Sequence, residues 1–314
     1  MPAAPTFTLR QLQLFCAAAD HGSFAAAAQA LYLTPNAVST AVRELETALG
    51  TDLCVRHRAR GLTLTPTGAH MLPKARALLR EAEEMHQTLG SVDGTLSGPV
   101  GVGCYSTLAA TVLPPLMDGF RRTHPGLELG VVDGTVTDLV GRLHDGQLDV
   151  VIAYRFGLPA DLEHVVLYET EGHVLLPADH RLAAAEAVRL TQVQDEPLIL
   201  LDLPPSDVHT LEMLSRAGVN PVVAHRTANY ELARSLVARG FGYSIMIQKP
   251  TIDESYEGRP LVAKRIVPPL PPAAVVVAWP RGARLTERAR ALVDYARTTV
   301  GSQQWTPATP APRR

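Results

Sequence analysis

A stripe of polar side chains recurs at helical spacing near the N-terminus. Asn36, Ser39, Thr40 and Arg43 stand at positions i, i+3, i+4 and i+7, which places them on one face of a helix. Amide, hydroxyl and guanidinium groups of this kind can hydrogen-bond to base edges and phosphates in the major groove of DNA. Thr34 can cap the start of the helix and completes this candidate DNA-binding set. The alternative interpretation is a solvated face of an ordinary helical bundle.

A cluster of cations follows this helix. Arg56, Arg58 and Arg60 alternate along the chain, so in an extended hairpin they project from one side. Such a hairpin would set positive charges along a phosphate backbone. A basic surface loop is the alternative, but the polar helix beside the cluster favours DNA binding.

Polar side chains also gather in the second half of the chain, where predicted strands end and helices begin. Parallel α/β sheets bind ligands beyond the carboxyl ends of their strands, and helix N-termini offer N–H groups to anions. The candidate ligand-binding residues at these points are Tyr105, Ser106, Thr107, Thr135, Tyr154, Arg155, Ser206, Thr227 and Asn229. The positive charge of Arg155 favours an acidic small molecule such as a carboxylate, with Tyr105 and Tyr154 flanking an apolar or aromatic body. Two alternatives stay open: the hydroxyl and amide groups only cap their helices, and Arg155 pairs with Asp202.

The sequence offers little support for catalysis or for a cofactor. Gly101-Val102-Gly103 lacks the third glycine of a dinucleotide fingerprint, because Ser106 stands in its place. No activating histidine can be assigned to Cys104 from spacing, and the histidines show no metal-ligand pattern. We therefore expect a protein that is not an enzyme and that holds no cofactor or metal.

Length and composition limit the class of protein. The chain has 314 residues, 46% of them apolar, which is enough for about two folded domains. The net charge is −2, so DNA binding requires a local basic patch. Cys16, Cys54 and Cys104 are too scattered for a disulfide framework, and no apolar run reaches the ~18 residues of a membrane helix. The N-terminus lacks the features of a signal peptide. We expect a cytoplasmic protein with no membrane partner.

The segment that carries the polar stripe is typical of a helix-turn-helix. Thr8 and Gln11 fit the capping box of a first helix, and Ser23, after Gly22, can cap a second. Thr34 then caps the third helix, the one with the stripe. After the basic cluster, residues 62–64 alternate like a strand, and Thr65-Pro66 can begin a long helix that reaches about Leu89.

The long helix has an apolar seam. Its apolar residues step by 3, 4, 3 and 4 positions, as in a heptad repeat, at Ala75, Leu78, Ala82, Met85 and Leu89. A single helix cannot bury such a seam alone, so we expect it to pair with its copy in a second subunit. Packing of the seam on the chain's own domain is the alternative.

Beyond a linker at residues 91–98 the pattern changes to alternating strands and helices. Strands are predicted at 100–103, 127–132, 150–153, 173–176, 198–201, 222–224, 243–247 and 274–278. Helices are predicted at 108–122, 136–144, 206–217, 229–239 and 285–299. This alternation predicts an α/β fold with a parallel sheet, followed by a disordered tail over 301–314.

Residues 9–68 resemble the winged helix-turn-helix of LysR-type transcriptional regulators, in residue type and in spacing. The matching residues are Leu9, Leu12, Phe15, Gly22-Ser23-Phe24, Ala27-Ala28, Leu31, Ala37-Val38-Ser39, Leu45-Glu46, Leu49-Gly50, Leu53, Arg56, Arg60, Leu64-Thr65 and Thr67-Gly68. A weaker resemblance extends to about residue 300, through Leu113-Pro114, Phe120, Pro125, Leu143, Gly146, Leu148-Asp149 and Gly240-Phe241-Gly242. Two departures stand out: Pro35-Asn36 replaces the family's usual glutamine after the capping residue, and Cys54 replaces a phenylalanine.

The resemblance implies the following organisation. Residues 1–65 form a winged helix-turn-helix, 66–90 a linker and dimerisation helix, and 91–300 an effector domain like a periplasmic binding protein. Its first lobe covers about 98–160 and 268–300, and its second lobe about 161–267.

The implied function is sequence-specific regulation of transcription. A homodimer or homotetramer would bind a partly palindromic double-stranded site, and a small effector between the lobes would move the DNA-binding arms. Two alternatives are a solute-binding protein or enzyme with a helical N-terminal extension, and an architectural DNA protein without a ligand.

Overall fold

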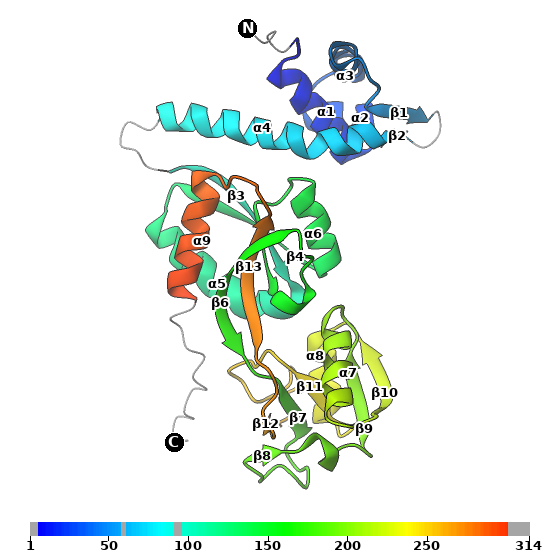
Figure 1. Cartoon of the computed structure of the whole chain (residues 1–314), viewed down its shortest axis with the longest axis vertical. Helices are drawn as coiled ribbons and strands as arrows, with labels where there is room; N and C mark the ends of the chain where they lie inside the picture. Colours follow the sequence, from blue (N-terminus) through cyan, green and yellow to red (C-terminus); the bar gives the residue numbers. More distant parts are fainter. Residues whose placement is uncertain (1–5, 58–60, 91–95, 301–314) are drawn as a thin grey trace.

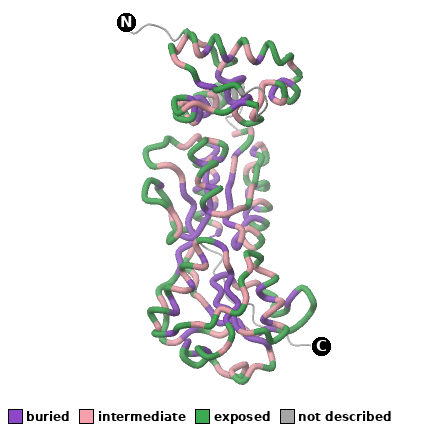
Figure 2. Tube along the Cα trace, turned by 90° about the vertical axis from the view of Figure 1, so that its right-hand side faces the viewer, coloured by how far each residue is buried: buried purple, intermediate pink, exposed green. Residues whose placement is uncertain are grey.

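The computed structural model describes residues 6–57, 61–90 and 96–300. Three bodies follow one another along the long axis of the molecule (Figure 1). An N-terminal helical unit with a small β-hairpin lies at one end, and two α/β lobes follow it. Buried segments concentrate inside each body (Figure 2). The predicted tail at 301–314 lies outside the described residues.

Capping side chains start the three helices of the N-terminal unit. Thr8, Ser23 and Thr34 each accept a hydrogen bond from the backbone N–H three residues on, at the starts of α1 (Leu9–His21), α2 (Phe24–Ala30) and α3 (Pro35–Leu49). Gly22 and Gly50 end α1 and α3 in the left-handed region. The predicted caps are confirmed. The apolar faces of these helices meet in a core that includes Leu12, Phe15, Val38, Val42 and Leu45, all 0% exposed.

The hairpin is tied to the helices through the backbone. β1 (Cys54–His57) pairs antiparallel with β2 (Gly61–Leu64). Leu62 N–H donates to the Gly22 carbonyl at 2.7 Å, so the second strand contacts the turn between α1 and α2. At Gly61 a Cβ would lie 2.4 Å from that carbonyl oxygen, so only glycine permits this approach.

The long helix α4 (Pro66–Gly90) lies between the helical unit and the first lobe (Figure 1). Its start follows Thr65, whose hydroxyl accepts from Gly68 N–H, as predicted. Arg76 contacts Asp20 of α1 and donates to the carbonyl of Asp145 in the first lobe. Arg80 donates to the neighbouring Gly146 carbonyl. The helix therefore connects the two bodies through its own side chains.

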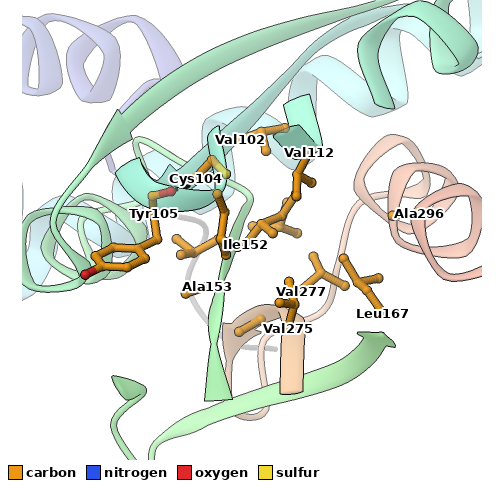
Figure 3. Packing of buried hydrophobic residues seen from close by; sticks show 14 of the residues in the cluster. Val102, Cys104, Tyr105, Val112, Ile152, Ala153, Leu167, Val275, Val277 and Ala296 are labelled. Carbon is orange, nitrogen blue, oxygen red and sulfur yellow. Dashed lines mark hydrogen bonds between the residues drawn. The ribbon is translucent and has the colours of Figure 1, made fainter. Parts of the chain in front are cut away.

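The first lobe is a five-stranded mixed sheet in the order β4-β3-β5-β13-β6. Its strands are β3 (Gly98–Tyr105), β4 (Leu127–Gly134), β5 (Val150–Tyr154), β6 (Leu162–Thr170) and β13 (Ala273–Pro280). The helices α5 (Ser106–Thr123), α6 (Val136–His144) and α9 (Glu287–Thr299) accompany it. Buried side chains from β3, β5, β6, β13, α5 and α9 meet in its core (Figure 3).

Two predictions about this lobe are wrong. Only β4, β3 and β5 are parallel, because β13 returns antiparallel to both β5 and β6, so the sheet is mixed. The predicted boundary at residue 161 also fails. β6 belongs to the first sheet, and the chain enters the second lobe only after Thr170.

The second lobe holds a four-stranded sheet in the order β11-β7-β12-β8 and a parallel pair, β9 with β10. Its strands are β7 (His173–Pro177), β8 (Ala187–Val188), β9 (Pro197–Leu201), β10 (Val222–Thr227), β11 (Ser244–Met246) and β12 (Leu261–Ile266). Its helices are α7 (Ser206–Arg216) and α8 (Tyr230–Ala238), and short 3₁₀ turns occur at η1 (Arg155–Gly157) in the first lobe and η2 (Leu190–Gln192). The strands β6, β8 and β12 are absent from the sequence-based prediction.

Candidate nucleic-acid interface and ligand cavity

The polar stripe of α3 faces away from the helical core. Asn36, Thr40 and Arg43 are exposed and Ser39 is half-buried, whereas the apolar residues on the opposite face are fully buried. Thr34 is exposed too, and its oxygen accepts from Ala37 N–H at 3.2 Å. Its capping role is therefore present, and its hydroxyl hydrogen stays free to donate. The helix presents a surface that can enter a groove.

Arg56 is held beside this helix by an aromatic ring. It lies on β1, exposed, with its guanidinium carbon 5.2 Å from the centre of the Phe24 ring of α2. The other two arginines of the predicted cluster, Arg58 and Arg60, lie outside the described residues.

A groove of about 470 Å³ separates α3 from the hairpin and brings two predicted cations together. Its lining residues are Arg43, Glu46, Asp52, Cys54, Val55, Arg56 and Thr65. Arg43 comes from the predicted base-reading stripe and Arg56 from the predicted phosphate-binding strand. Such a shared groove is expected where a helix contacts bases in the major groove and a wing beside it contacts phosphates.

Glu46 positions the hairpin, and it is absent from the predicted site residues. One of its carboxylate oxygens accepts from Leu53 N–H at 2.9 Å and from Cys54 N–H at 3.0 Å. It therefore fixes the start of the hairpin to α3. The available signal was its place in the Leu45-Glu46 pair of the family pattern.

A cavity of about 1080 Å³ lies where the first lobe meets the second. It is lined by the start of α5, by α8 and by the segment 248–258. Three predicted ligand residues line it together, namely Ser106 and Thr107 of α5 and Asn229 before α8. Asn229 also caps α8, because its side-chain oxygen accepts from Leu232 N–H.

One buried hydroxyl group in this cavity lacks a hydrogen-bond partner among the described residues, namely Ser255 Oγ, on a residue 5% exposed. The hydroxyl of Thr107, a residue 8% exposed, is hydrogen-bonded to Tyr154. Gln248, 3% exposed, lies in the same lining and donates to Thr111 Oγ1 at 2.7 Å. Because buried polar groups are normally bonded, the Ser255 hydroxyl suits a polar ligand.

The structure corrects the prediction for Arg155. This residue begins η1, is exposed, and does not line the cavity that Ser106 and Thr107 share. The alternative partner, Asp202, lies 3.4 Å from Arg226 and forms no ion pair with Arg155. The turn that begins with Arg155 packs on the second lobe, with Gly157 against Pro205 and Phe156 on His209.

Five further predicted ligand residues lie outside the cavity lining. Tyr105 and Tyr154 are 0% and 1% exposed, so they cannot flank a ligand in the cavity. Thr135 caps α6, Ser206 is hydrogen-bonded to Tyr105, and Thr227 accepts from Asn229 N–H at 3.1 Å. For these threonines the capping and turn interpretation is correct.

Arg234 is a cation at the cavity that sequence reasoning missed. It is 4% exposed, forms an ion pair with Glu231 at 2.9 Å, and donates to the carbonyls of Ile252 and Glu254. It therefore holds the 248–258 segment against α8. The i, i+3 spacing of Glu231 and Arg234 was the only signal in the sequence.

The cysteines are poor candidates for redox or catalytic chemistry. Cys104 is 0% exposed, and burial raises the pKa of its thiol well above the ordinary value. Burial also raises the pKa of Cys16 to about 11. Over the described residues no group of three potential metal ligands occurs, and no helix there is long and apolar enough to cross a membrane.

Comparison with known proteins identifies both parts of the chain. The family model for the bacterial regulatory helix-turn-helix protein of the lysR family matches residues 9–69, and that for the LysR substrate binding domain matches residues 93–301. The transcriptional regulator YvbU of Bacillus subtilis is 30% identical over 300 residues, which cover 94% of this chain and 100% of YvbU.

Solved structures agree with this assignment. HinK, a LysR family regulator from Pseudomonas aeruginosa, is 34% identical with a TM-score of 0.64, over 94% of this chain and 99% of HinK. A full-length OxyR variant from Pseudomonas aeruginosa, at 24% identity and a TM-score of 0.74, covers 93% of this chain and 98% of its own and shows the shared fold. The chain therefore belongs to the LysR family of transcriptional regulators, with a DNA-binding winged helix-turn-helix and an effector-binding domain of two lobes.

Proposed function

We propose that this regulator binds a partly palindromic double-stranded DNA site with α3 in the major groove. Asn36, Ser39, Thr40 and Arg43 would contact base edges, with Thr34 at a phosphate. Arg56, together with Arg58 and Arg60, would contact phosphates beside the groove. The observation that carries this proposal is the groove in which Arg43 of the stripe and Arg56 of the hairpin stand together.

We propose that two subunits pair through α4. Leu78 and Met85 of the predicted seam are 41% and 65% exposed, which leaves apolar surface for a partner. Ala75 is an exception, since it is 1% exposed and packs in its own helical unit. The partner seam accordingly begins at Leu78. A homodimer follows from one such contact, and pairing of dimers would give a homotetramer.

We propose that the effector is a small acidic molecule in the cavity between α5 and α8. Two features support this: the N-terminus of α5 opens on the cavity at Ser106 and Thr107, and the buried hydroxyl of Ser255 is unpartnered among the described residues. Backbone N–H groups and hydroxyls at a helix N-terminus favour a carboxylate. Arg155 lies outside the lining of this cavity.

On this proposal the protein acts at DNA in the cytoplasm and does not catalyse a reaction. Its response is a ligand-dependent shift between arrangements of its bodies. Neither a cofactor nor a metal ion takes part.

Thermal melting of the full chain against small carboxylates and their neutral amides tests the effector proposal. A ligand at 100 times its Kd adds about 2.7 kcal/mol of stability, so binding is readily seen. We expect a carboxylate to raise the melting temperature more than its amide. Thr107→Val, which keeps the shape and removes the hydroxyl, should weaken that response.

Thr137→Val, on the exposed face of α6, is the matched control and should respond like the wild type. A carboxylate response that Thr107→Val leaves intact would place the ligand elsewhere. A response to the amides alone would contradict the acidic effector.

A further inference from the structure

Tyr105 ends β3 and extends out of the first lobe. Its ring lies at the edge of the buried cluster, and its hydroxyl points away from Val102 and Ile152 (Figure 3). The residue is 0% exposed. Leu201 and Leu203 of the second lobe belong to the same buried cluster, so the second lobe helps to cover the ring.

The hydroxyl of Tyr105 is bound by the second lobe. It donates to the carbonyl of Leu203 at 2.8 Å and lies 2.9 Å from Ser206 Oγ. Both partners belong to the segment that enters α7. Burial raises the pKa of the phenol to about 12, so the hydroxyl keeps its proton and can donate. A polar group at the carboxyl end of β3 and the N-terminus of α7 occupies the place where an α/β protein takes a ligand.

A second set of contacts closes the same side of the boundary between the lobes. Phe156 of η1 stacks on His209 of α7 with ring centroids 4.0 Å apart, and on Tyr154 at 5.1 Å. Tyr154 in turn meets the ring of Tyr105 edge-on at 5.9 Å. A Cβ on Gly157 would lie 2.3 Å from Pro205 Cγ. The aromatic rings of the chain therefore fill this side of the boundary between the lobes.

The opposite side of α5 differs. There the cavity of about 1080 Å³ is open, and the buried hydroxyl of Ser255 lacks a partner among the described residues. Tyr105 and Ser106 are neighbours at the start of one helix. The Tyr105 hydroxyl is bonded to the second lobe, whereas Ser106 lines the open cavity.

We propose that Tyr105 is a specificity-determining residue that acts as a built-in ligand. Its phenol occupies the interlobe space between β3 and α7, excludes aromatic molecules from it, and confines effectors to the cavity between α5 and α8. This inference rests on the proposed function in assuming that an effector binds between the lobes. The filled space itself can be tested without an effector.

Removal of the phenol tests the proposal, with phenol itself as the probe. Tyr105→Ala leaves a space of the size of phenol, lined by an acceptor at Leu203 and a hydroxyl at Ser206. Phenol should raise the melting temperature of full-length Tyr105→Ala by about 2–4 °C, the shift expected for roughly 1 kcal/mol of binding. Benzene, which lacks the hydroxyl, should raise it less. Neither compound should stabilise the wild type.

Two control variants separate this site from other binding. Phe120→Ala removes a fully buried ring of the same lobe that packs on His124 and Tyr295. Its cavity lacks the Leu203 carbonyl and the Ser206 hydroxyl, so its preference for phenol over benzene should be smaller than that of Tyr105→Ala. Adding Ala110→Phe to Tyr105→Ala obstructs the cavity between α5 and α8, because Ala110 is exposed in its lining. The phenol response should survive this second change.

Loss of the phenol response in the double variant would place phenol in the other cavity and overturn the proposal. So would equal responses to phenol and benzene in Tyr105→Ala.

Tyr105→Phe gives a test that does not depend on folding of the alanine variant. It keeps the ring and removes both hydrogen bonds to the second lobe. Amide hydrogen exchange at residues 203–209 should become faster, and exchange at α9 should stay unchanged. Unchanged exchange at 203–209 would show that the hydroxyl does not hold the lobes. A protein with no effector would still give the phenol result, so the two proposals fail separately.

Discussion

At the scale of single residues, His173 is a buried imidazole, and no acidic group contributes to the shift of its pKa. It lies on β7, is 8% exposed, and pairs in register with Met246 of β11 and Arg265 of β12. Burial lowers its pKa to about 3, and the positive charges of Lys249 and Arg234 contribute to the same shift. The folded protein therefore holds His173 neutral throughout the ordinary pH range.

This burial makes stability depend on pH in a definite direction. In the unfolded chain His173 titrates near 6.5, so between pH 6.5 and 3 the unfolded state binds a proton that the folded state does not. The contribution is complete above pH 6.5 and is lost as the pH falls, by about 1.4 kcal/mol per pH unit. From pH 7.5 to 5 the wild type should lose about 2 kcal/mol more unfolding free energy than His173→Gln, measured by urea denaturation. Parallel losses in the two proteins would show that His173 titrates normally.

In the ligand site, the sequence predicted some of the cavity residues and not others. Ser106, Thr107 and Asn229 could be placed together because each begins a helix at the same end of a strand. Arg155 also follows the end of a strand, but the prediction for it was wrong. The 3₁₀ turn that it begins packs against Pro205, a contact that the sequence does not reveal. Arg234 and Gln248 could not be found, since their places at the cavity depend on contacts with distant segments. Arg234 of α8 bonds the Glu254 carbonyl, and Gln248 bonds Thr111 of α5.

At the scale of elements, the signals that worked were local. Thr8, Ser23 and Thr34 predicted the starts of three helices correctly, because capping needs only neighbours in sequence. β6 and β12 escaped prediction. β6 exposes much of its length, and β12 mixes Lys264 and Arg265 with apolar residues, so neither has the continuous apolar run of β5. The antiparallel return of β13 also has no local signature.

The exposed part of α4 supports a prediction about assembly. Leu78 is 41% exposed on the proposed seam, so Leu78→Glu would set two carboxylates against each other in a dimer. Sedimentation velocity should show monomer or an altered assembly for this variant. Ala69→Glu, at an exposed residue on the opposite face of the helix, adds negative charge to α4 and should assemble normally. Wild-type assembly of Leu78→Glu would mean that α4 does not pair two subunits.

At the scale of the whole molecule, two arginines of α4 join the DNA-binding unit to the first lobe. Arg76 is 8% exposed and bridges Asp20 of α1 to the carbonyl of Asp145 after α6. Arg80 donates to the Gly146 carbonyl and lies 3.6 Å from Asp149, which also accepts from Gly101 N–H of β3. A chain of polar contacts therefore runs from α1 to the strand that carries Tyr105.

Arg76→Met should loosen this connection without unfolding either body. Methionine fills most of the same space but cannot donate to Asp20 or to the Asp145 carbonyl. Amide hydrogen exchange in residues 145–149 should become faster, and small-angle scattering should show a larger radius of gyration. Arg121→Met, an exposed change on α5, is the control and should alter neither quantity. Wild-type exchange at 145–149 in Arg76→Met would mean that the contact does not hold the bodies together.

The central claim is that α3 reads bases while the hairpin beside it holds phosphates. The measurement that tests it most directly is the affinity of the full chain for a site selected from random double-stranded DNA, set against unselected DNA over a range of salt concentrations. Arg43→Ala should cost about 1–3 kcal/mol of binding free energy on the selected site and little on unselected DNA. Arg56→Ala should weaken binding to both DNAs alike and reduce the salt slope by about one unit. Equal losses on both DNAs for Arg43→Ala, or an unchanged salt slope for Arg56→Ala, would contradict it.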